Sequence, residues 1–530
     1  MIQNFFTEVK KISNEISAYY KQNKTIHLFT VIWLLFLYGM RLVHWDIFVD
    51  SDIMLATPEE LMFSWYGHRR FGLILTKRLF SFVRLNPYIE NILLLLVMWL
   101  IVFLIGFSFY VWSGKKKVYS RAIPLFILVF PSAACFAEQF GFTLQSFESA
   151  LAMLFCVIAA ICAEQTIQEK KNILWLIPAM GFMIWAFGSY QAYPAFFIAL
   201  VIMAFVIVYM RNEEKSGFKE AVCYLILFLV SFALTQIFAT VICKLEGGDS
   251  SYVNAMFSWG NQSVSVCLDN IKSDFIRIYG GEWALFFSPH FKWCVLFGTL
   301  LLITYCWRLK SKKFIWLFFS LLVLAVTPIL ITILTANLQP IRAQMTYPLV
   351  YAFYIMICYV IFYKFAGELQ GTVKKLMKAG CLCVCLVCVI LGWKQGVNMN
   401  QLWETAHEVY QSDTLTANRM YEDICEVADR TDMENCKVAF VGTRPASLAG
   451  NPLRGDVIGF SSFQWDSGSA IGVSGRVKTF FSILGLTVNA PSAEEYQEAL
   501  IESKNHPSWP ANDSVFMVGE CVVVKLSEVE

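Results

Sequence analysis

Long apolar stretches alternate with short polar segments over the first three quarters of the chain. A helix needs about 20 apolar residues to cross a bilayer, and eleven stretches come near that length. They centre on residues 26–43, 92–112, 123–136, 149–163, 173–188, 195–210, 221–243, 293–307, 314–334, 349–365 and 376–393. The pattern therefore predicts an all-α polytopic membrane domain over residues 25–393, with about eleven transmembrane helices.

Lysine and arginine gather in the polar connections, and their distribution predicts the orientation of the chain. Cytoplasmic connections carry the excess of these residues. Six clusters fall at every second connection: Lys10, Lys11, Lys21 and Lys24; Lys115, Lys116, Lys117 and Arg121; Lys170 and Lys171; Arg211, Lys215 and Lys219; Arg308, Lys310, Lys312 and Lys313; Lys364, Lys374, Lys375 and Lys378. The N-terminus is thus predicted inside and the C-terminus outside, with outer polar segments at 45–91, 138–148, 244–291 and 335–348.

The two ends of the chain lie outside the apolar stretches. Residues 1–24 are too long and too acidic for the start of a cleaved signal, so we expect a cytoplasmic, interfacial amphipathic segment. Residues 394–530 predict a small extracytoplasmic α/β domain. Its expected elements are a helix over 400–429, a strand over 436–442, a serine-capped helix over 492–503 and a hairpin that turns at Gly519.

Composition excludes several classes of protein. The chain has 530 residues, of which 57% are hydrophobic and 15% charged, so it is not an ordinary soluble domain. The net charge of +2 gives no basic surface for a nucleic acid. The 16 cysteines and six histidines show no zinc-ligand spacing, and no GxSxG motif marks a serine hydrolase.

The first outer segment, residues 45–91, has an unusual concentration of charge. It contains Asp46, Asp50, Asp52, Glu59, Glu60, His68, Arg69, Arg70, Lys77, Arg78 and Arg84. Outer segments normally carry few lysines and arginines. A solvated loop with interfacial cations is one interpretation. The mixture with Trp65 and Tyr66 instead favours a site for a sugar and a phosphate. Asp50 and Asp52 would face the same side if the chain there is extended.

Two short motifs in this segment resemble a known family. VDSD at residues 49–52, just after the first apolar stretch, precedes YGHRRFG at residues 66–72. An acidic pair followed by a Gly-Arg-aromatic element resembles the O-antigen type II glucosyltransferases, membrane enzymes of the GT-C class. The sequence departs from the pattern because His68 separates Gly67 from the arginines. Arg70, directly before Phe71, fits the motif better than Arg69.

The resemblance implies transfer of glucose or a similar hexose from a polyprenyl-phosphate donor to an extracytoplasmic cell-surface glycan, at the membrane surface. Asp50 or Asp52 is the expected base, and Glu138, at a helix end, is a second candidate acid. Fixed cations would stabilise the leaving lipid phosphate without a metal or other cofactor. The residues expected to contact the donor are Arg69, Arg70 and Arg342 for the phosphate, and Trp65, Tyr66 and His68 for the sugar. For Arg342 and Glu138, an interfacial arginine and an exposed helix-end glutamate are the alternative interpretations.

Two other functions share this topology. A glycan polymerase or ligase would use similar arginine-rich outer segments but take a long lipid-linked glycan as its donor. A transporter or flippase of lipid-linked sugars would bury ionisable residues near the middle of the bilayer. The apolar stretches contain almost no charge away from their ends, so transport is the less favoured interpretation.

Overall fold

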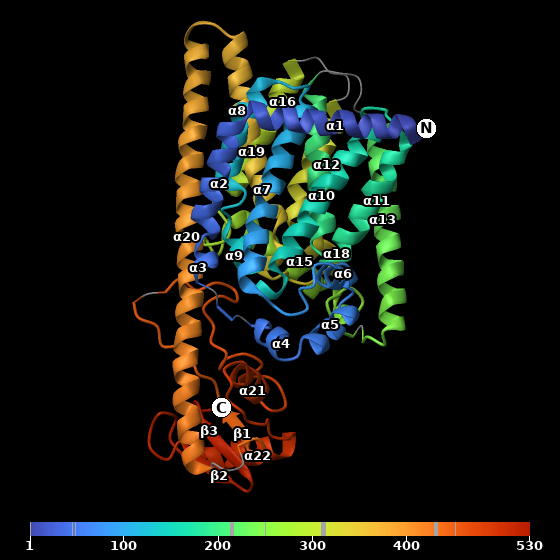
Figure 1. The fold of residues 1–530 in the computed structure, drawn as a ribbon. Coiled ribbons are helices and arrows are strands. Elements are labelled where there is room, and N and C mark those ends of the chain that lie inside the picture. The colour runs from blue at the N-terminus through green and yellow to red at the C-terminus, as the bar shows by residue number, and fades with distance from the viewer. Residues whose placement is uncertain are drawn as a thin grey trace.

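The computed structural model describes residues 2–44, 46–47, 49–211, 217–249, 251–308, 314–428, 433–450 and 452–529. Most of the chain is helical, and a small sheet lies near the C-terminus, as predicted (Figure 1). The helices up to residue 209 are α1 (Ile2–Gln22), α2 (Lys24–Tyr38), α3 (Met40–Val43), α4 (Ser51–Ala56), α5 (Pro58–Gly67), α6 (Phe71–Leu79), α7 (Pro87–Trp112), α8 (Lys117–Val129), α9 (Ala134–Gly141), η1 (Thr143–Gln145), α10 (Ser146–Ile167), η2 (Ile173–Trp175), α11 (Leu176–Phe187) and α12 (Tyr193–Tyr209).

The second half of the bundle continues in the same manner. Its helices are α13 (Phe218–Leu245), α14 (Ser251–Ala255), α15 (Val264–Gly280), α16 (Phe291–Arg308), α17 (Phe314–Val326), η3 (Thr327–Ile329), α18 (Leu330–Thr335), η4 (Ile341–Ala343), α19 (Thr346–Glu368) and α20 (Gly371–Val427). Each of the eleven predicted apolar stretches overlaps one or more of the helices in the two halves of the bundle.

Fewer helices than eleven could cross a membrane by length and composition alone. Among the described residues, six helical stretches meet that requirement, and a bent pair, α8 with α9, makes a seventh. The shorter apolar helices include α2, α11 together with η2, and α12. The structure thus supports a polytopic membrane protein, while the count of eleven spans stays a prediction.

The chain changes direction between α8 and α9. The two helices meet at 61° across the break. Pro131 lies in this break, and it has no backbone N–H with which to continue the helical hydrogen bonds. The bend places the short helix α9, which carries Glu138, beside η4, which carries Arg342.

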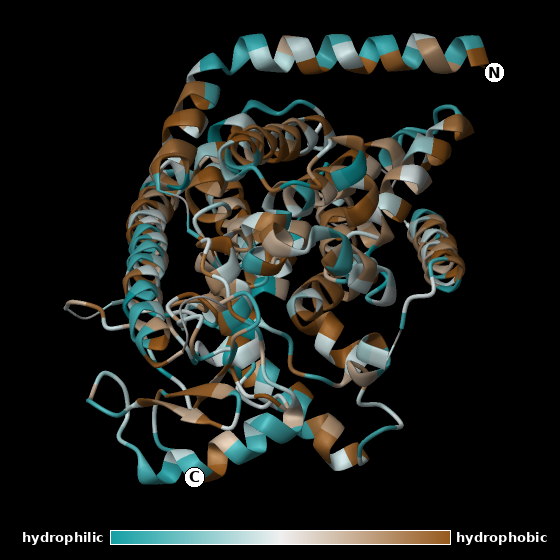
Figure 2. Ribbon diagram, turned by 60° about the horizontal axis from the view of Figure 1, so that its bottom comes forward, coloured by the Kyte–Doolittle hydropathy of each residue, from teal (hydrophilic) through white to brown (hydrophobic). Residues whose placement is uncertain are grey.

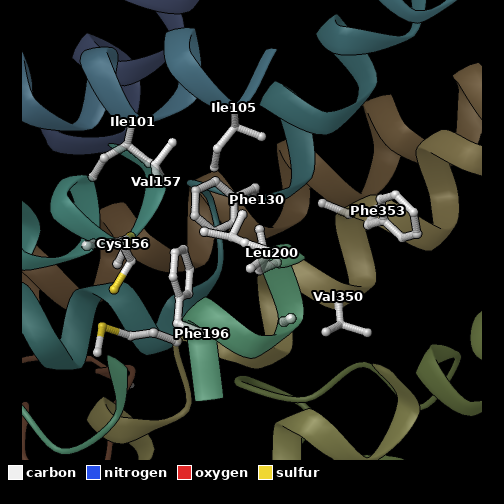
Figure 3. Packing of buried hydrophobic residues seen from close by; sticks show 14 of the residues in the cluster. Ile101, Ile105, Phe130, Cys156, Val157, Phe196, Leu200, Val350 and Phe353 are labelled. Atoms are coloured by element: carbon white, nitrogen blue, oxygen red, sulfur yellow. The ribbon is translucent and has the colours of Figure 1, made fainter. Parts of the chain in front are cut away.

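The centre of the bundle is a closely packed apolar core. Figure 3 shows side chains from five segments that meet there: Ile101 and Ile105, Phe130, Cys156 and Val157, Phe196 and Leu200, and Val350 and Phe353. Most of α10 and α19 is buried, whereas α13 and α20 expose most of their apolar surface. Exposed apolar helices at the periphery are what a bilayer-embedded bundle requires.

The N-terminal helix α1 lies across one end of the bundle, and the C-terminal sheet lies beyond the other end (Figure 1). Polar and apolar residues alternate along α1 (Figure 2), as expected for an interfacial helix. Glu8 of α1 accepts a hydrogen bond from the indole Nε1 of Trp175 at 2.8 Å, so the helix is tied to the bundle.

The last 160 residues begin with an unexpectedly long helix. We predicted one apolar helix over 376–393 and a separate polar helix over 400–429, but α20 runs through both. A Cβ atom on Gly392 would lie 2.7 Å from the Leu128 carbonyl oxygen, and one on Gly396 would lie 2.6 Å from the Phe36 ring. These glycines therefore act as sites of close helix packing rather than as a helix stop.

The C-terminal domain, here residues 433–529, packs against the far end of α20. Its elements are β1 (Lys437–Val441), α21 (Ser474–Ile483), α22 (Ala493–Glu502), η6 (Ser503–Asn505), β2 (Val515–Val518) and β3 (Cys521–Lys525). The strand order is β1-β3-β2, with β1 parallel and β2 antiparallel to β3. The predicted serine cap of α22 and the hairpin turn, with Gly519 at φ 58°, are both confirmed.

Candidate active site

The first outer segment folds as three short helices, α4, α5 and α6, at the end of the bundle that faces the C-terminal domain (Figure 1). The chain at the aspartate pair is not extended, so the condition under which we expected the two side chains to face the same side is not met. Asp50 adopts a positive φ of 68° immediately before α4, and Asp52 lies in the first turn of that helix. The turn at Asp50 nevertheless brings the two carboxylates to one common partner.

That partner is Arg476 of α21, in the C-terminal domain. Its Nη1 lies 2.9 Å from Asp52 Oδ1, and its Nη2 lies 3.1 Å from Asp50 Oδ1. Its Nε and Nη2 also contact Asp466 Oδ2, at 3.0 and 2.9 Å. All three guanidinium nitrogens are thus occupied by carboxylates from two parts of the chain that are more than 400 residues apart.

The two aspartates differ in exposure. The Asp50 side chain is 43% exposed, whereas that of Asp52 is only 3% exposed. Burial raises the pKa of Asp52 to about 6, although Arg476 and the Ile53 amide act in the opposite direction. Both of these donors bind Oδ1. Among the described residues, Oδ2 of Asp52 accepts no hydrogen bond, so it is the atom left to take a proton.

The glycines of the YGHRRFG motif allow the backbone to pack closely against other elements. A Cβ atom on Gly67 would lie 2.0 Å from the Asp249 carbonyl oxygen, and one on Gly72 would lie 2.4 Å from that of Trp185. The Gly72 amide also donates to the Gly188 carbonyl oxygen at 2.8 Å. These contacts fix the backbone on both sides of the arginines.

The two arginines of the motif have different surroundings. Arg69 donates to Gln236 Oε1 of α13 at 3.1 Å. Arg70 lies over the Tyr190 ring, with its guanidinium carbon 5.2 Å from the ring centroid, and its buried Nε has no hydrogen-bond partner. Burial and the nearby charge of Arg342 lower the pKa of Arg70, while Tyr190, Tyr252 and Asp50 oppose that shift. Arg70 therefore lies within electrostatic range of both Asp50 and Arg342.

Arg342 reaches the same region from far along the chain. It lies in η4, and its guanidinium carbon is 4.9 Å from the centroid of the Phe142 ring. Within the part of the chain that the structure describes, neither Arg70 nor Arg342 forms an ion pair. Two neighbouring cations supported by aromatic rings, without a carboxylate partner, are suited to an anionic ligand.

Glu138 is not joined to the aspartate pair by any contact among the described residues. It is fully buried in α9, and its carboxylate oxygens accept from the backbone amides of Asp456 at 2.8 Å and Val457 at 3.0 Å. Asp456 in turn accepts from the Ile341 amide, next to Arg342, at 3.0 Å. Glu138 thus anchors a loop of the C-terminal domain, and its role as a second acid stays a prediction.

The aromatic residues expected at the sugar are mostly core residues. Trp65 and Tyr66 are 3% and 7% exposed. His68 is half-buried, and its ring centroid lies 4.2 Å from that of Tyr252. Burial and Arg70 together lower the pKa of His68 to about 4, which keeps the ring neutral. Sugar contacts by these three side chains stay a prediction.

Sequence reasoning missed the contribution of the C-terminal domain. The residues Val477, Phe480 and Phe481 have the spacing of a helix face, and this was the available signal for α21. Nothing local indicated that Arg476 would meet Asp52. A cleft of about 500 Å³ opens beside Arg476, lined by Asp466 and by the glycine-rich loop that leads to α21. In the described ranges, no group of three or more His, Cys, Asp or Glu residues is arranged to hold a metal.

Comparison with known proteins places most of this site within one family model. The model described as glucosyl transferase GtrII matches residues 39–365, more than half of the chain. The matched part includes Asp50, Asp52, Arg70 and Arg342, whereas Arg476 lies beyond it. Searches of curated proteins and of solved structures gave no match.

Proposed function

The chain belongs to the glucosyl transferase GtrII family, and we propose that it transfers glucose or a similar hexose from a polyprenyl-phosphate donor to an extracytoplasmic cell-surface glycan. The family membership and the apolar helices make it a membrane glycosyltransferase. The observation that supports this donor and this acceptor is that two kinds of charge lie close together. A carboxylate pair lies within electrostatic range of an arginine that has no ion-pair partner among the described residues.

The carboxylate side provides the base. In an inverting displacement, an acceptor hydroxyl loses its proton as its oxygen attacks the anomeric carbon of the donor. We assign this proton to Oδ2 of Asp52, because a pKa of about 6 lets the group be ionised at neutral pH and still hold a proton. Asp50, which is more exposed, orients the acceptor hydroxyl through the exposed part of its carboxylate.

The guanidinium side provides the electrophilic assistance. As the bond between the anomeric carbon and the phosphate oxygen breaks, negative charge grows on the departing lipid phosphate. Arg70 and Arg342 are the groups we assign to this charge, and a planar guanidinium binds phosphate through two parallel hydrogen bonds. Arg69, already bonded to Gln236, has the smaller part.

The placement of the site suits a lipid-linked donor. The short helices α4, α5 and α6 adjoin the end of the bundle opposite α1 (Figure 1), so the reacting carbon would lie at the membrane surface while the polyprenyl chain stays in the bilayer. The lysine and arginine distribution assigns that end to the outside. The N-terminus is then cytoplasmic, and the C-terminal domain and the acceptor share the extracytoplasmic face.

A reconstituted assay tests the proposal and separates it from its competitors. The purified protein is placed in lipid vesicles with radiolabelled polyprenyl-phosphate glucose, and envelope glycan lacking that glucose is added outside. We expect label to move into the glycan, one hexose at a time. Label that crosses the bilayer and stays on its lipid would indicate a flippase. Joining of preformed glycan chains without transfer of the labelled hexose would indicate a polymerase or ligase.

A further inference from the structure

Arg476 is the one charged group through which the C-terminal domain reaches the proposed base in the described structure. We propose that Arg476 is a positioning residue of the transferase site, so that the active site is shared between the membrane bundle and the C-terminal domain. The proposal rests on the function proposed above. It assigns a role to a residue outside the part of the chain that the family model matches.

The geometry of Arg476 is that of a fixed support. The side chain is buried and its planar fork is fully used: Nη1 binds Asp52, Nη2 binds Asp50 and Nε binds Asp466. Asp466, which has a backbone φ of 62°, contacts both Nε and Nη2 through its Oδ2 and so shares Nη2 with Asp50. Because a planar fork has one orientation once its nitrogens are engaged, it fixes the separation of the two aspartates.

The contact of Arg476 with the aspartates is not needed to hold the C-terminal domain on the membrane bundle. The domain is held independently by Glu138, which binds the amides of Asp456 and Val457. It is held again by Asp413 of α20, which accepts from the Ser461 hydroxyl and the Ser462 amide, both at 2.7 Å. Loss of Arg476 should therefore disturb the aspartates while the domain stays docked.

Arg476 also sets the charge around Asp52. The elements packed against α4 are α5, η1 and α21. Their charged residues are Glu59 and Glu60 of α5, both exposed, and Arg476 and Lys478 of α21, while η1 has none. Of these groups, Arg476 is the cation that contacts Asp52, and the negative charge of Asp50 lies beside it. Removing the guanidinium should raise the pKa of Asp52, since an opposing charge at this distance lowers a carboxylate pKa by about 1 unit or more.

The test uses the full-length protein in vesicles, with Arg476→Ala, Arg476→Lys and, as a control, Arg444→Ala. Arg444 is a partly buried arginine whose contacts, to Trp509, stay within the C-terminal domain. The measurements are kcat, the KM for acceptor and the pH dependence of kcat. We expect Arg476→Ala to lower kcat on the order of 100-fold, the loss that a small misplacement of a catalytic group causes. The acid limb of its kcat–pH profile should move to a pH about 1 unit higher.

Arg476→Lys separates charge from geometry. It keeps the cation, so its acid limb should stay near that of the wild type, but it loses the fork, so kcat should still fall on the order of 10-fold. Arg444→Ala should change neither quantity. If both Arg476 variants keep the kcat and the pH profile of the wild type, the contact of Arg476 with the aspartates only attaches the C-terminal domain. If Arg476→Ala is faster than the wild type, the contact inhibits the enzyme. Either result overturns this inference alone, whereas a wild-type protein that transfers no hexose overturns the proposed function.

Discussion

Lys77 and Arg70 come from the same short outer segment, yet they meet opposite surroundings. Lys77 is fully buried, with its Nζ 2.8 Å from Glu148 Oε1 and 3.4 Å from Glu90 Oε1. Arg70 has the Tyr190 ring beneath it and a buried Nε without a hydrogen-bond partner. One cation is neutralised by the protein itself, and the other is not.

The difference separates a structural charge from one that fits a ligand. A buried charge is costly unless it is paired, so Lys77 with its two glutamates forms a closed unit that joins α6 to α7 and α10. Arg70 and Arg342 share a region with aromatic support and no ion pair in the described structure. In the proposed function, the lipid phosphate would neutralise Arg70 and Arg342 as the two glutamates neutralise Lys77.

The largest effect is expected at Lys77. Lys77→Met leaves Glu90 and Glu148 buried together without a cation, and breaking a buried ion pair in this way costs about 3–5 kcal/mol. We expect little folded protein, measured as the yield of monodisperse protein and its thermal unfolding in detergent. Arg78→Met is the matched control, since Arg78 lies next along α6 and is exposed. A stable, active Lys77→Met protein would remove the distinction between the two cations.

Arg70→Ala should have the opposite profile, with a normal yield and a loss of function. We expect kcat/KM for the polyprenyl-phosphate donor to fall on the order of 100-fold, as when one donor to a developing charge is removed. Arg70→Lys should recover only part of the rate, because a point charge cannot replace a two-pronged contact. Arg69→Ala, which removes the neighbouring arginine, should cost much less. Equal losses in both alanine variants would contradict the special role of Arg70.

Arg342→Ala should also lower donor use, but by less than Arg70→Ala. Its loss in kcat/KM for donor should be on the order of 10-fold, and the double Arg70→Ala, Arg342→Ala variant should lose less than the product of the single effects. Such coupling is expected if both arginines bind one phosphate group. Fully multiplicative losses would mean that the two side chains act on different parts of the substrate.

Local patterns predicted the parts of the fold that depend on local sequence. The apolar stretches predicted helices, and the motif Ser-Ala-Glu-Glu predicted the cap of α22, where Ser492 accepts from the Glu495 amide. The short helices α4 to α6 were missed, since charge and aromatic residues obscure their periodicity. The continuity of α20 was missed because an apolar stretch over 376–393 and a polar helix over 400–429 differ in composition, and no local pattern shows that one helix joins them.

The candidate site could be predicted only in part, for a physical reason. Asp50, Asp52 and the arginines are close in sequence or stand out as isolated charges in an outer segment. The pairs Arg476–Asp52 and Lys77–Glu148 depend on tertiary packing, with separations of 424 and 71 residues. A single sequence does not encode such pairs in any local pattern. The contact of the C-terminal domain with the aspartate pair therefore came from the structure.

The most direct test of the account is the transfer rate of Asp52→Asn beside that of Asp50→Asn, at matched expression. Burial outweighs Arg476 and raises the pKa of Asp52 to about 6, so at neutral pH the ionised group lowers rather than raises stability. The stabilisation that a proton on Asp52 provides is complete below the unfolded pKa and is lost as the pH rises through about 6. Asparagine removes this cost, and the unfolding temperature of Asp52→Asn should stay equal or rise.

The rate should respond in the opposite sense. We expect Asp52→Asn to lose a factor on the order of 100 to 10,000 in kcat, the range for removal of a general base, and wild-type kcat to fall below about pH 6 as Asp52 gains its proton. Asp50→Asn should lose less and raise the KM for acceptor. If Asp52→Asn and the double Asp50→Asn, Asp52→Asn variant both transfer hexose at near-normal rates, the carboxylate pair is not the catalytic centre.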